Sequence, residues 1–371
     1  MNFVIEKEIL LNKIRIVEKI TAQRGNQPIL SNVLIETFSS NEIKIYSTDN
    51  DMSIETKAIA SVKKEGKITL PAKKLFEIIS KMPDKPICFD LDEEKNIMKI
   101  SCSNIKFELL GIDATEFPQV ENIEEKENMI VVETTPFLKA VKGTAYAAAN
   151  YENRNIISGV FTLLENDKLE MAATDGNRLT KVVQPIENKA NVSQKMVIPS
   201  KTLQEILRIL SIENDNEIKM CIENIKIYIK IKDTILISKL LEGEYPPYQQ
   251  LIPKTCEKEA VISREEMISS IERISTMVDE RKNFVKFIFN ENNLNMFADT
   301  PESGKAEENI DIEYSSEEQI IAFNYKYVLE ALKNIESEKI KVKMNGSLSA
   351  TIFEPEGNDN YLCLIMPIQI R

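Results

Sequence analysis

The chain of 371 residues contains no histidine and no tryptophan. Histidine is the side chain that most often acts as a general base near neutral pH, and it is also the commonest zinc ligand. The chain has five cysteines: Cys88, Cys102, Cys221, Cys256 and Cys363. They form no Cys-x-x-Cys pair, which argues against a zinc cage or a thioredoxin-like site and favours buried, reduced thiols. We therefore expect no metal and no cofactor.

Long apolar runs are also missing, since no stretch approaches the roughly 18 residues that a membrane helix needs. Charged residues interrupt the N-terminal segment at Glu6, Lys7 and Glu8, so it does not have the pattern of a signal peptide. We expect a cytoplasmic protein. The net charge is −12, and an acidic chain taken by itself is a poor candidate for binding nucleic acid.

The sequence does contain a threefold repeat. Residues 42–49, 168–175 and 293–300 share alternating apolar positions that run into a polar turn, a pattern typical of a half-buried strand. Aligned on Ser47, Ala173 and Ala298, the three segments lie 126 and 125 residues apart. A repeat of this length is too long for a solenoid unit and indicates three duplicated domains.

Each repeat also predicts two amphipathic helices. Leu10, Ile14 and Val17 lie at helical spacing before the first repeated strand, and Ser263 to Glu266 have the sequence of a capping box before a later helix. Alternating strands follow the second helix of each repeat. We predict an α+β fold of three tandem domains, 1–122, 128–251 and 252–371, each with two helices packed on antiparallel sheets.

Four segments carry a resemblance to a known family. They are Pro-Ile-Leu-Ser-Asn-Val-Leu at 28–34, Ala-Thr-Asp-Gly-Asn-Arg-Leu at 173–179, Leu-Glu-Gly-Glu-Tyr-Pro at 241–246, and Met366-Pro367. With the threefold duplication, they make the whole chain resemble the bacterial sliding clamps, the beta subunits of DNA polymerase III. The resemblance implies the DNA clamp fold and a head-to-tail homodimer that forms a ring of six domains.

The resemblance also implies a function. The ring would encircle double-stranded DNA without reading its sequence, and would act as a processivity factor for the replicative polymerase. It would have no catalytic activity. Its expected partners are DNA, a second copy of itself, the DNA polymerase III alpha subunit, the clamp loader, and other replication and repair proteins with clamp-binding motifs. A ring needs only weak contacts with phosphates, so the net charge of −12 does not argue against this kind of DNA binding.

Three groups of site residues follow from the resemblance. The expected DNA contacts are Arg24, Lys73, Lys74, Asn150, Arg154 and Lys201, and further basic residues of the helices, Arg208 and Lys333 among them, belong to the same diffuse surface. The expected partner-peptide cleft is lined by Ile157, Thr174, Gly176, Asn177, Arg178, Leu179, Pro246, Gln250, Leu251, Leu364, Met366, Pro367 and Ile368. The expected dimer interface contains Phe107, Leu109, Thr276 and Met277.

Other interpretations remain open at this stage. Asn177 and Gln250 depart from the family pattern, so the peptide preference is not predicted, and Leu179, Leu251 and Leu364 have the alternative of being core residues. Asp49 and Asp51 form a carboxylate pair that suits a metal site in an enzyme, although aspartates after a strand usually shape turns. A protein-interaction scaffold with no DNA role is the remaining alternative.

Overall fold

The computed structural model describes residues 1–21, 27–119, 129–150, 155–165, 167–187, 193–279, 283–300 and 304–369. Its contacts separate into two compact units. Unit 1 contains Met1–Thr134 and Gln204–Leu240, and unit 2 contains Thr135–Leu203 and Leu241–Arg371. This division cuts through the second predicted domain, because part of that domain pairs with the first and part with the third.

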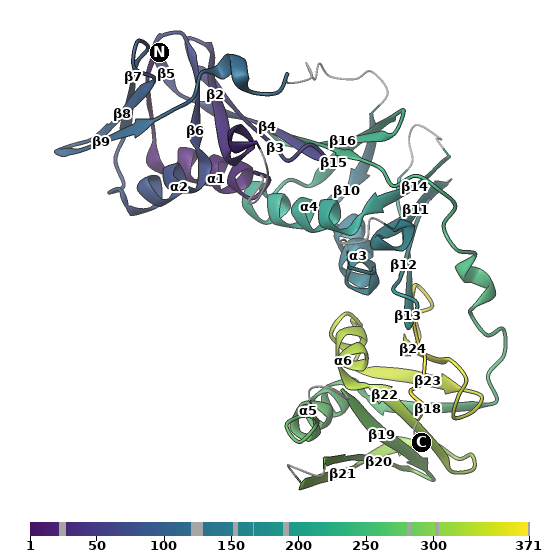
Figure 1. The fold of residues 1–371 in the computed structure, drawn as a ribbon. Helices are drawn as coiled ribbons and strands as arrows, with labels where there is room; N and C mark the ends of the chain where they lie inside the picture. Colours follow the sequence, from purple (N-terminus) through teal and green to yellow (C-terminus); the bar gives the residue numbers. More distant parts are fainter. Residues whose placement is uncertain are drawn as a thin grey trace. The chain divides into compact units, whose positions relative to one another are not determined.

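Unit 1 contains the helices α1 (Lys7–Glu18) and α2 (Ala72–Lys81), most of a third helix described below with unit 2, and two antiparallel sheets (Figure 1). One sheet has the order β5-β1-β7-β8-β9 and the other β10-β15-β16-β17-β4-β3-β2-β6. The strands are β1 (Asn2–Ile5), β2 (Asn32–Ser39), β3 (Glu42–Thr48), β4 (Met52–Ile59), β5 (Ser61–Lys64), β6 (Lys67–Pro71), β7 (Ile87–Asp92), β8 (Ile97–Cys102), β9 (Ile105–Leu110), β10 (Ile130–Glu133), β15 (Glu217–Glu223), β16 (Lys226–Ile231) and β17 (Thr234–Lys239).

Unit 2 is organised around one antiparallel run of twelve strands, in the order β14-β11-β12-β13-β25-β24-β23-β18-β21-β20-β19-β22. Its helices are α3 (Thr134–Thr144), α5 (Arg264–Ser275) and α6 (Tyr325–Lys333), while α4 (Ser200–Glu213) spans the border between the units. The strands are β11 (Gly159–Glu165), β12 (Lys168–Thr174), β13 (Arg178–Pro185), β14 (Gln194–Pro199), β18 (Lys258–Ser263), β19 (Phe284–Asn290), β20 (Asn293–Thr300), β21 (Gly304–Glu313), β22 (Gln319–Asn324), β23 (Lys339–Met344), β24 (Thr351–Pro355) and β25 (Tyr361–Ile365).

The helices form where the apolar spacing predicted them. Leu10, Ile14 and Val17 are all buried on α1, so the helix presents one apolar stripe to the sheets of unit 1. Ser263 occupies the N-cap position of α5 as expected, but its side chain makes no capping hydrogen bond. The prediction of a capping box was therefore right in position and wrong in its contacts.

The same strand pairing joins successive predicted domains in both units. In unit 1, β17 from the second domain pairs antiparallel with β4 from the first, with Ile237 opposite Ser53. In unit 2, β25 from the third domain pairs antiparallel with β13 from the second, with Leu364 opposite Leu179. In each case the last strand of one domain extends the sheet of the domain before it.

Polar contacts reinforce this junction in unit 1. The Lys13 ammonium on α1 lies 2.6 Å from a carboxylate oxygen of Glu213 at the end of α4, and both side chains are buried. The guanidinium of Arg208 donates to the main-chain oxygens of Arg15 and Ile16, both at 2.7 Å. These are carbonyls in the last turn of α1, where a positive charge is favourable. Arg208 therefore stabilises this junction.

Within the described residues, no helix combines the length and the apolar character needed to cross a bilayer.

Candidate functional site: a turn and strand ends in unit 2

The turn between β12 and β13 is held by its own side chains. The hydroxyl of Thr174 donates to the main-chain oxygen of Arg178 at 2.6 Å and accepts from the amide of Gly176 at 3.1 Å. A carboxylate oxygen of Asp175 accepts from the amides of Asn177 and Arg178, at 2.9 and 3.0 Å. Gly176 has φ of +91°, a left-handed conformation that glycine adopts without strain. These internal hydrogen bonds hold the turn in one conformation.

Arg178 ties this turn to the helices of unit 2. Its guanidinium donates to Asp175 at 3.1 Å, to the main-chain oxygen of Tyr146 at 2.8 Å, and to Glu330 on α6. It also lies 4.3 Å from the ring centre of Tyr327. Burial lowers the pKa of Arg178, but the hydrogen bond and the attraction of Glu330 outweigh burial and raise it overall. These contacts make Arg178 a support of the turn.

An apolar cluster lies along the strands that flank the turn. Leu179 on β13 and Leu364 on β25 are directly opposite each other and buried, together with Phe161, Ala172 and Tyr248. The Phe161 ring centre is 5.4 Å from that of Tyr248. The Tyr248 hydroxyl donates to Glu170, and its burial together with this hydrogen bond and the carboxylate's charge raises the pKa of Tyr248.

Phe161, Tyr245 and Tyr248 are not among the site residues predicted from the sequence. All three pack at this cluster, with ring centres of Phe161 and Tyr245 at 5.7 Å. The available signal was the pair of tyrosines flanking Pro246 and Pro247, because aromatic side chains beside a rigid proline turn lose little entropy when they pack.

The structure brings most of the predicted cleft residues to one region but gives them different exposures. Thr174, Arg178, Leu179 and Leu364 are buried; Ile157, Pro246, Pro367 and Ile368 are half-buried; and Gly176, Asn177, Gln250, Leu251 and Met366 are exposed. The amide of Met366 donates to the main-chain oxygen of Asn177 at 2.9 Å, so the C-terminal segment is attached to the turn. Ile157 lies in a short 3₁₀ helix, Ile156–Ser158, that leads into β11.

The core alternative therefore applies to two of the three leucines. Leu179 and Leu364 are only 1% and 4% exposed and belong to the cluster, whereas Leu251 is 56% exposed. Together with Met366, which is 43% exposed, Leu251 leaves apolar area open to solvent. Exposed apolar side chains of this kind are suited to contact a partner.

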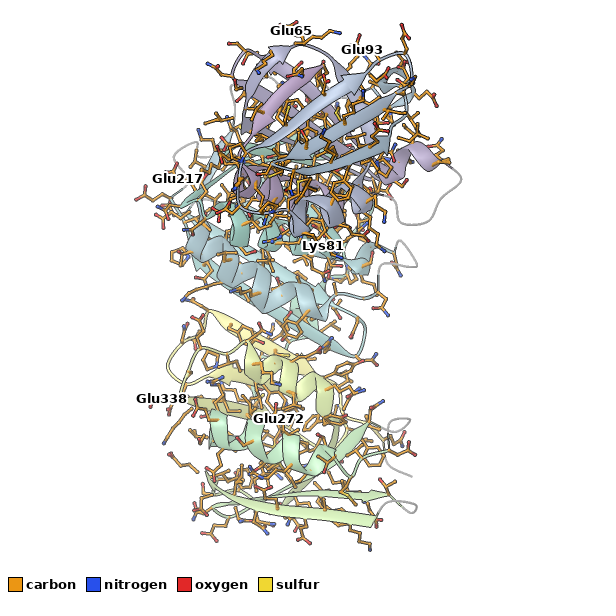
Figure 2. All side chains as sticks on the ribbon, turned by 90° about the vertical axis from the view of Figure 1, so that its left-hand side faces the viewer. Glu65, Lys81, Glu93, Glu217, Glu272 and Glu338 are labelled. Atoms are coloured by element: carbon orange, nitrogen blue, oxygen red, sulfur yellow. The ribbon has the colours of Figure 1, made fainter. Side chains whose placement is uncertain are left out.

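The predicted DNA contacts lie on several elements. Lys73 and Lys74 are exposed in the first turn of α2, where Lys74 pairs with Glu77 at 2.9 Å, and Lys201 is half-buried at the start of α4. Asn150 is exposed, whereas Arg24 and Arg154 lie outside the described residues. Figure 2 shows Lys81 at the end of α2, and also Glu272 on α5, which forms an ion pair with Lys333 at 2.7 Å.

The predicted interface residues lie on one strand and at one helix end. β9, which carries Phe107 and Leu109, is an edge strand of its sheet. Phe107 is 41% exposed and Leu109 is buried. Thr276 follows α5, with its hydroxyl bonded to the main-chain oxygen of Arg273, and the Met277 carbonyl accepts from Thr300 at the end of β20.

The aspartates that suggested an enzyme have a structural role in turn formation. A carboxylate oxygen of Asp49 accepts from the amides of Asp51 and Met52, at 3.1 and 2.8 Å. In the part of the chain that the structure describes, no three His, Cys, Asp or Glu residues are grouped as a metal site requires.

We predict that Arg178→Met lowers the free energy of unfolding by about 2 kcal/mol, because it leaves the Tyr146 carbonyl and the acceptors on Asp175 and Glu330 without their charged donor. Urea denaturation followed by circular dichroism measures the change. The matched control is Arg273→Met, which removes the ion pair between the exposed Arg273 on α5 and Glu308 on β21 and should cost much less. Equal losses in the two variants would show that the Arg178 contacts carry no special stability.

Comparison with known proteins covers the whole chain. Residues 1–121, 131–247 and 249–369 match the N-terminal, central and C-terminal domains of the DNA polymerase III beta subunit. The beta sliding clamps of Bacillus subtilis and Escherichia coli are 29% and 27% identical to it, with full coverage of both chains. The crystal structure of the Bacillus subtilis DNA polymerase sliding clamp has a TM-score of 0.91 at 28% identity, again with full coverage. The chain therefore belongs to the family of DNA polymerase III beta subunits, the bacterial sliding clamps, whose members are non-catalytic subunits.

Proposed function

We propose that this protein is a DNA sliding clamp: two copies join head to tail, close a ring around double-stranded DNA, and hold the replicative polymerase on its template. Family membership over the full length supports this proposal. We place the protein in the bacterial cytoplasm, at the nucleoid during replication.

The observation that carries the proposal is an unfinished strand pairing. The last strand of the second domain, β17, pairs with β4, and the last strand of the third, β25, pairs with β13. The last strand of the first domain, β9, ends its sheet, with no strand on its outer edge among the described residues. The three repeated strands aligned in the sequence are β3, β12 and β20, and the strands that follow them are β4, β13 and β21. In the third domain, β21 therefore corresponds to β4 and β13.

The complementary edge is on β21. Residues 304–311 pair with β20 on one side, and within the described ranges only Ile312 and Glu313 pair on the other, with β18. An unpaired edge is a template for a strand of another chain. Pairing β9 of one copy with β21 of the second would repeat the junction found inside the chain, and doing so twice produces a closed, twofold-symmetric assembly.

The predicted interface residues fit this pairing. Phe107 and Leu109 lie on β9 itself, and Met277 lies beside the start of β21, since its terminal methyl group comes within 3.3 Å of the position that a Cβ on Gly304 would take. Thr276 is exposed next to it. We therefore assign the interface to β9 and β21, flanked by the end of α5.

DNA binding would be topological and sequence-independent. Lys73, Lys74, Asn150 and Lys201, with Arg24 and Arg154, are proposed as weak phosphate contacts. Several helix cations are paired with carboxylates, as Lys74 is with Glu77 and Lys139 with Glu336. A lysine that is already paired with a carboxylate neutralises phosphate charge less strongly, so fewer counterions are released from the DNA when the protein binds. The contacts are then weak, and the ring can move along the duplex.

The region around the Thr174–Leu179 turn is proposed as the partner-peptide cleft. Its occupants would be short segments of the polymerase III alpha subunit, the clamp loader, and replication and repair proteins. Leu251 and Met366 would supply apolar contacts, and methionine adapts to differently shaped side chains. Thr174 has its hydroxyl engaged within the turn, so we assign the orienting polar contacts to the exposed Asn177 and Gln250.

We expect the protein, once loaded, to stay on closed circular DNA and to leave linear DNA, because a ring slides off free ends. Gel filtration before and after cutting the circle with a restriction enzyme measures this retention. Equal loss from circular and linear DNA would reject encirclement and favour the interaction scaffold.

Phe107→Asp should yield monomers in sedimentation velocity, because it places a charge in an interface formed by strand pairing. Ile59→Asp is the matched control, since Ile59 is an exposed apolar residue of the same unit at the end of β4. That variant should remain dimeric. A dimer that survives Phe107→Asp would place the interface away from β9.

Met366→Ala combined with Leu251→Ala should weaken binding of a synthetic alpha-subunit clamp-binding peptide by about tenfold or more, through the loss of apolar contact area. Both side chains are exposed, so the fold should be retained. Ile225→Ala, an exposed apolar residue of unit 1, serves as the control. Unchanged affinity of the double variant in isothermal titration calorimetry would move the cleft elsewhere.

A further inference from the structure

The turn that shapes the proposed peptide cleft is present a second time, in unit 1. The hydroxyl of Thr48 donates to the main-chain oxygen of Met52 at 2.8 Å and accepts from the amide of Asn50 at 3.2 Å. A carboxylate oxygen of Asp49 accepts from the amides of Asp51 and Met52, just as that of Asp175 accepts from the amides of Asn177 and Arg178. Asn50 has φ of +76° where Gly176 has +91°. The two turns therefore share these hydrogen bonds, and Thr48 adds one with the Ser53 hydroxyl at 2.8 Å.

The strands beside the two turns can be compared position by position. Ser53 lies opposite both Thr48 and Ile237, and Leu179 lies opposite both Thr174 and Leu364. Ser53 thus replaces Leu179, and Ile237 replaces Leu364. Two residues further along the last strand, Lys239 replaces Met366. Lys226 lies opposite Lys239 on β16; in unit 2 the printed pairing ends one residue earlier, at Thr351 opposite Ile365, so continuing that register places Ala350 at the position of Lys226. The unit 1 surface has the same framework with more polar and basic side chains.

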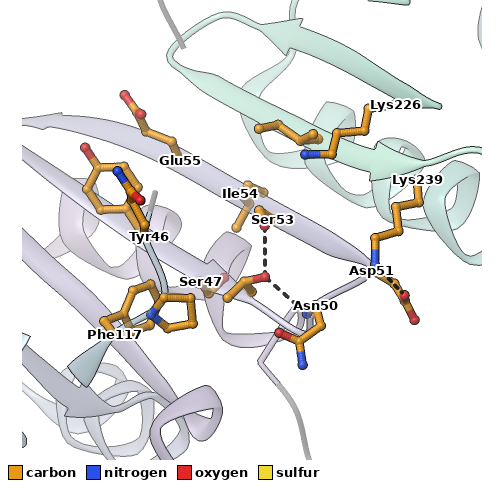
Figure 3. Close-up of a pocket in the computed structure, with 14 residues that line it drawn as sticks. Tyr46, Ser47, Asn50, Asp51, Ser53, Ile54, Glu55, Phe117, Lys226 and Lys239 are labelled. Atoms are coloured by element: carbon orange, nitrogen blue, oxygen red, sulfur yellow. Dashed lines mark hydrogen bonds and ion pairs between the residues drawn. The ribbon is translucent and has the colours of Figure 1, made fainter. Parts of the chain in front are cut away.

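This surface contains a cavity of about 210 Å³. Its apolar walls come from Tyr46, Ile54, Phe117, Pro118 and Ile237. Figure 3 shows Tyr46 and Phe117 on one side of the pocket and Lys226 and Lys239 on the other, with Ile54 and Ser53 between them. Tyr46 and Phe117 belong to a buried apolar cluster with Leu34, so the aromatic wall is anchored.

Lys226 and Lys239 place two positive charges on one side of the cavity, where an anion would bind in competition with the groups they already contact; Lys226 has a partner of its own and lies opposite Glu223 on β15. Glu55 lines the opposite side, but it is buried and paired with Lys44 at 3.2 Å, which compensates its charge. Asp51 lies 3.5 Å from Lys239, and both side chains are partly exposed, so this pair is long and solvated. A carboxylate that approaches Lys226 and Lys239 would form charge-assisted hydrogen bonds, with its apolar substituent against Tyr46 and Phe117.

We propose that this pocket is a second ligand site, which binds a large apolar residue with a free carboxylate, as found at the C-terminus of a peptide. The aromatic wall takes the side chain, and Lys226 and Lys239 take the carboxylate. The site is separate from the proposed peptide cleft in unit 2, which presents Met366 and Ala350 at the positions of the two lysines. It requires neither DNA nor ring closure.

The missing tryptophan provides a direct assay. Because the chain contains none, the fluorescence anisotropy of N-acetyl-L-tryptophan, excited at its red edge, reports binding to the full-length protein without a protein background. N-acetyl-L-tryptophanamide has the same side chain and no carboxylate. We expect the acid to bind and the amide to bind about tenfold more weakly.

The double variant Lys226→Gln, Lys239→Gln should weaken binding of the acid by about tenfold and leave the amide unaffected. Lys57→Gln with Lys63→Gln removes two charges from the same unit outside the pocket lining and should bind as the unaltered protein does. Circular dichroism melting checks that both variants are folded.

Three results would overturn the proposal. They are equal affinity of the acid and the amide, equal loss in both lysine double variants, or no binding of the acid to the unaltered protein. Loss of acid binding in Met366→Ala, with none in the Lys226 and Lys239 variant, would assign the probe to unit 2 and would also reject the pocket. None of these results bears on DNA retention, so the clamp function is tested independently.

Discussion

Antiparallel pairing between the last strand of one domain and the third long strand of the preceding domain is the constraint on which the other features depend. It occurs as β17 on β4 and again as β25 on β13. Main-chain hydrogen bonds supply this pairing, so it tolerates large changes in side chains, and the duplicated domains need share only their pattern of apolar positions. The same constraint leaves β9 and one edge of β21 available, and from these two edges we infer the dimer.

Each junction also has polar contacts of its own. Unit 1 uses the buried Lys13–Glu213 pair and the guanidinium of Arg208 at the end of α1. Unit 2 uses Arg178, which joins its turn to Tyr146 and Glu330. Buried charges of this kind are costly to leave unpaired, so they favour one arrangement of the two domains over others. Duplication has preserved the backbone of the junction, while the charged groups that secure it have diverged.

The divergence extends to the surface beside each turn. The turn at Thr48 and the turn at Thr174 share a set of hydrogen bonds, yet one is flanked by Lys239 and the other by Met366. A duplicated framework can therefore present ligand surfaces of different chemistry at equivalent places. We infer a partner-peptide cleft in one and a carboxylate pocket in the other.

From the sequence alone, apolar periodicity predicted the helices, the repeated strands and the α+β class, because burial of one face is written directly into residue spacing. The resemblance located the turn at 173–179, but local pattern did not show that Leu179 is buried and Leu251 exposed, or that Phe161 and Tyr248 join them. Nor did local pattern show that the guanidinium of Arg208 is bonded to main-chain oxygens of α1. Only the tertiary structure decided these points, because they depend on contacts between residues far apart in the chain, and the sequence spacing of two residues does not specify such contacts.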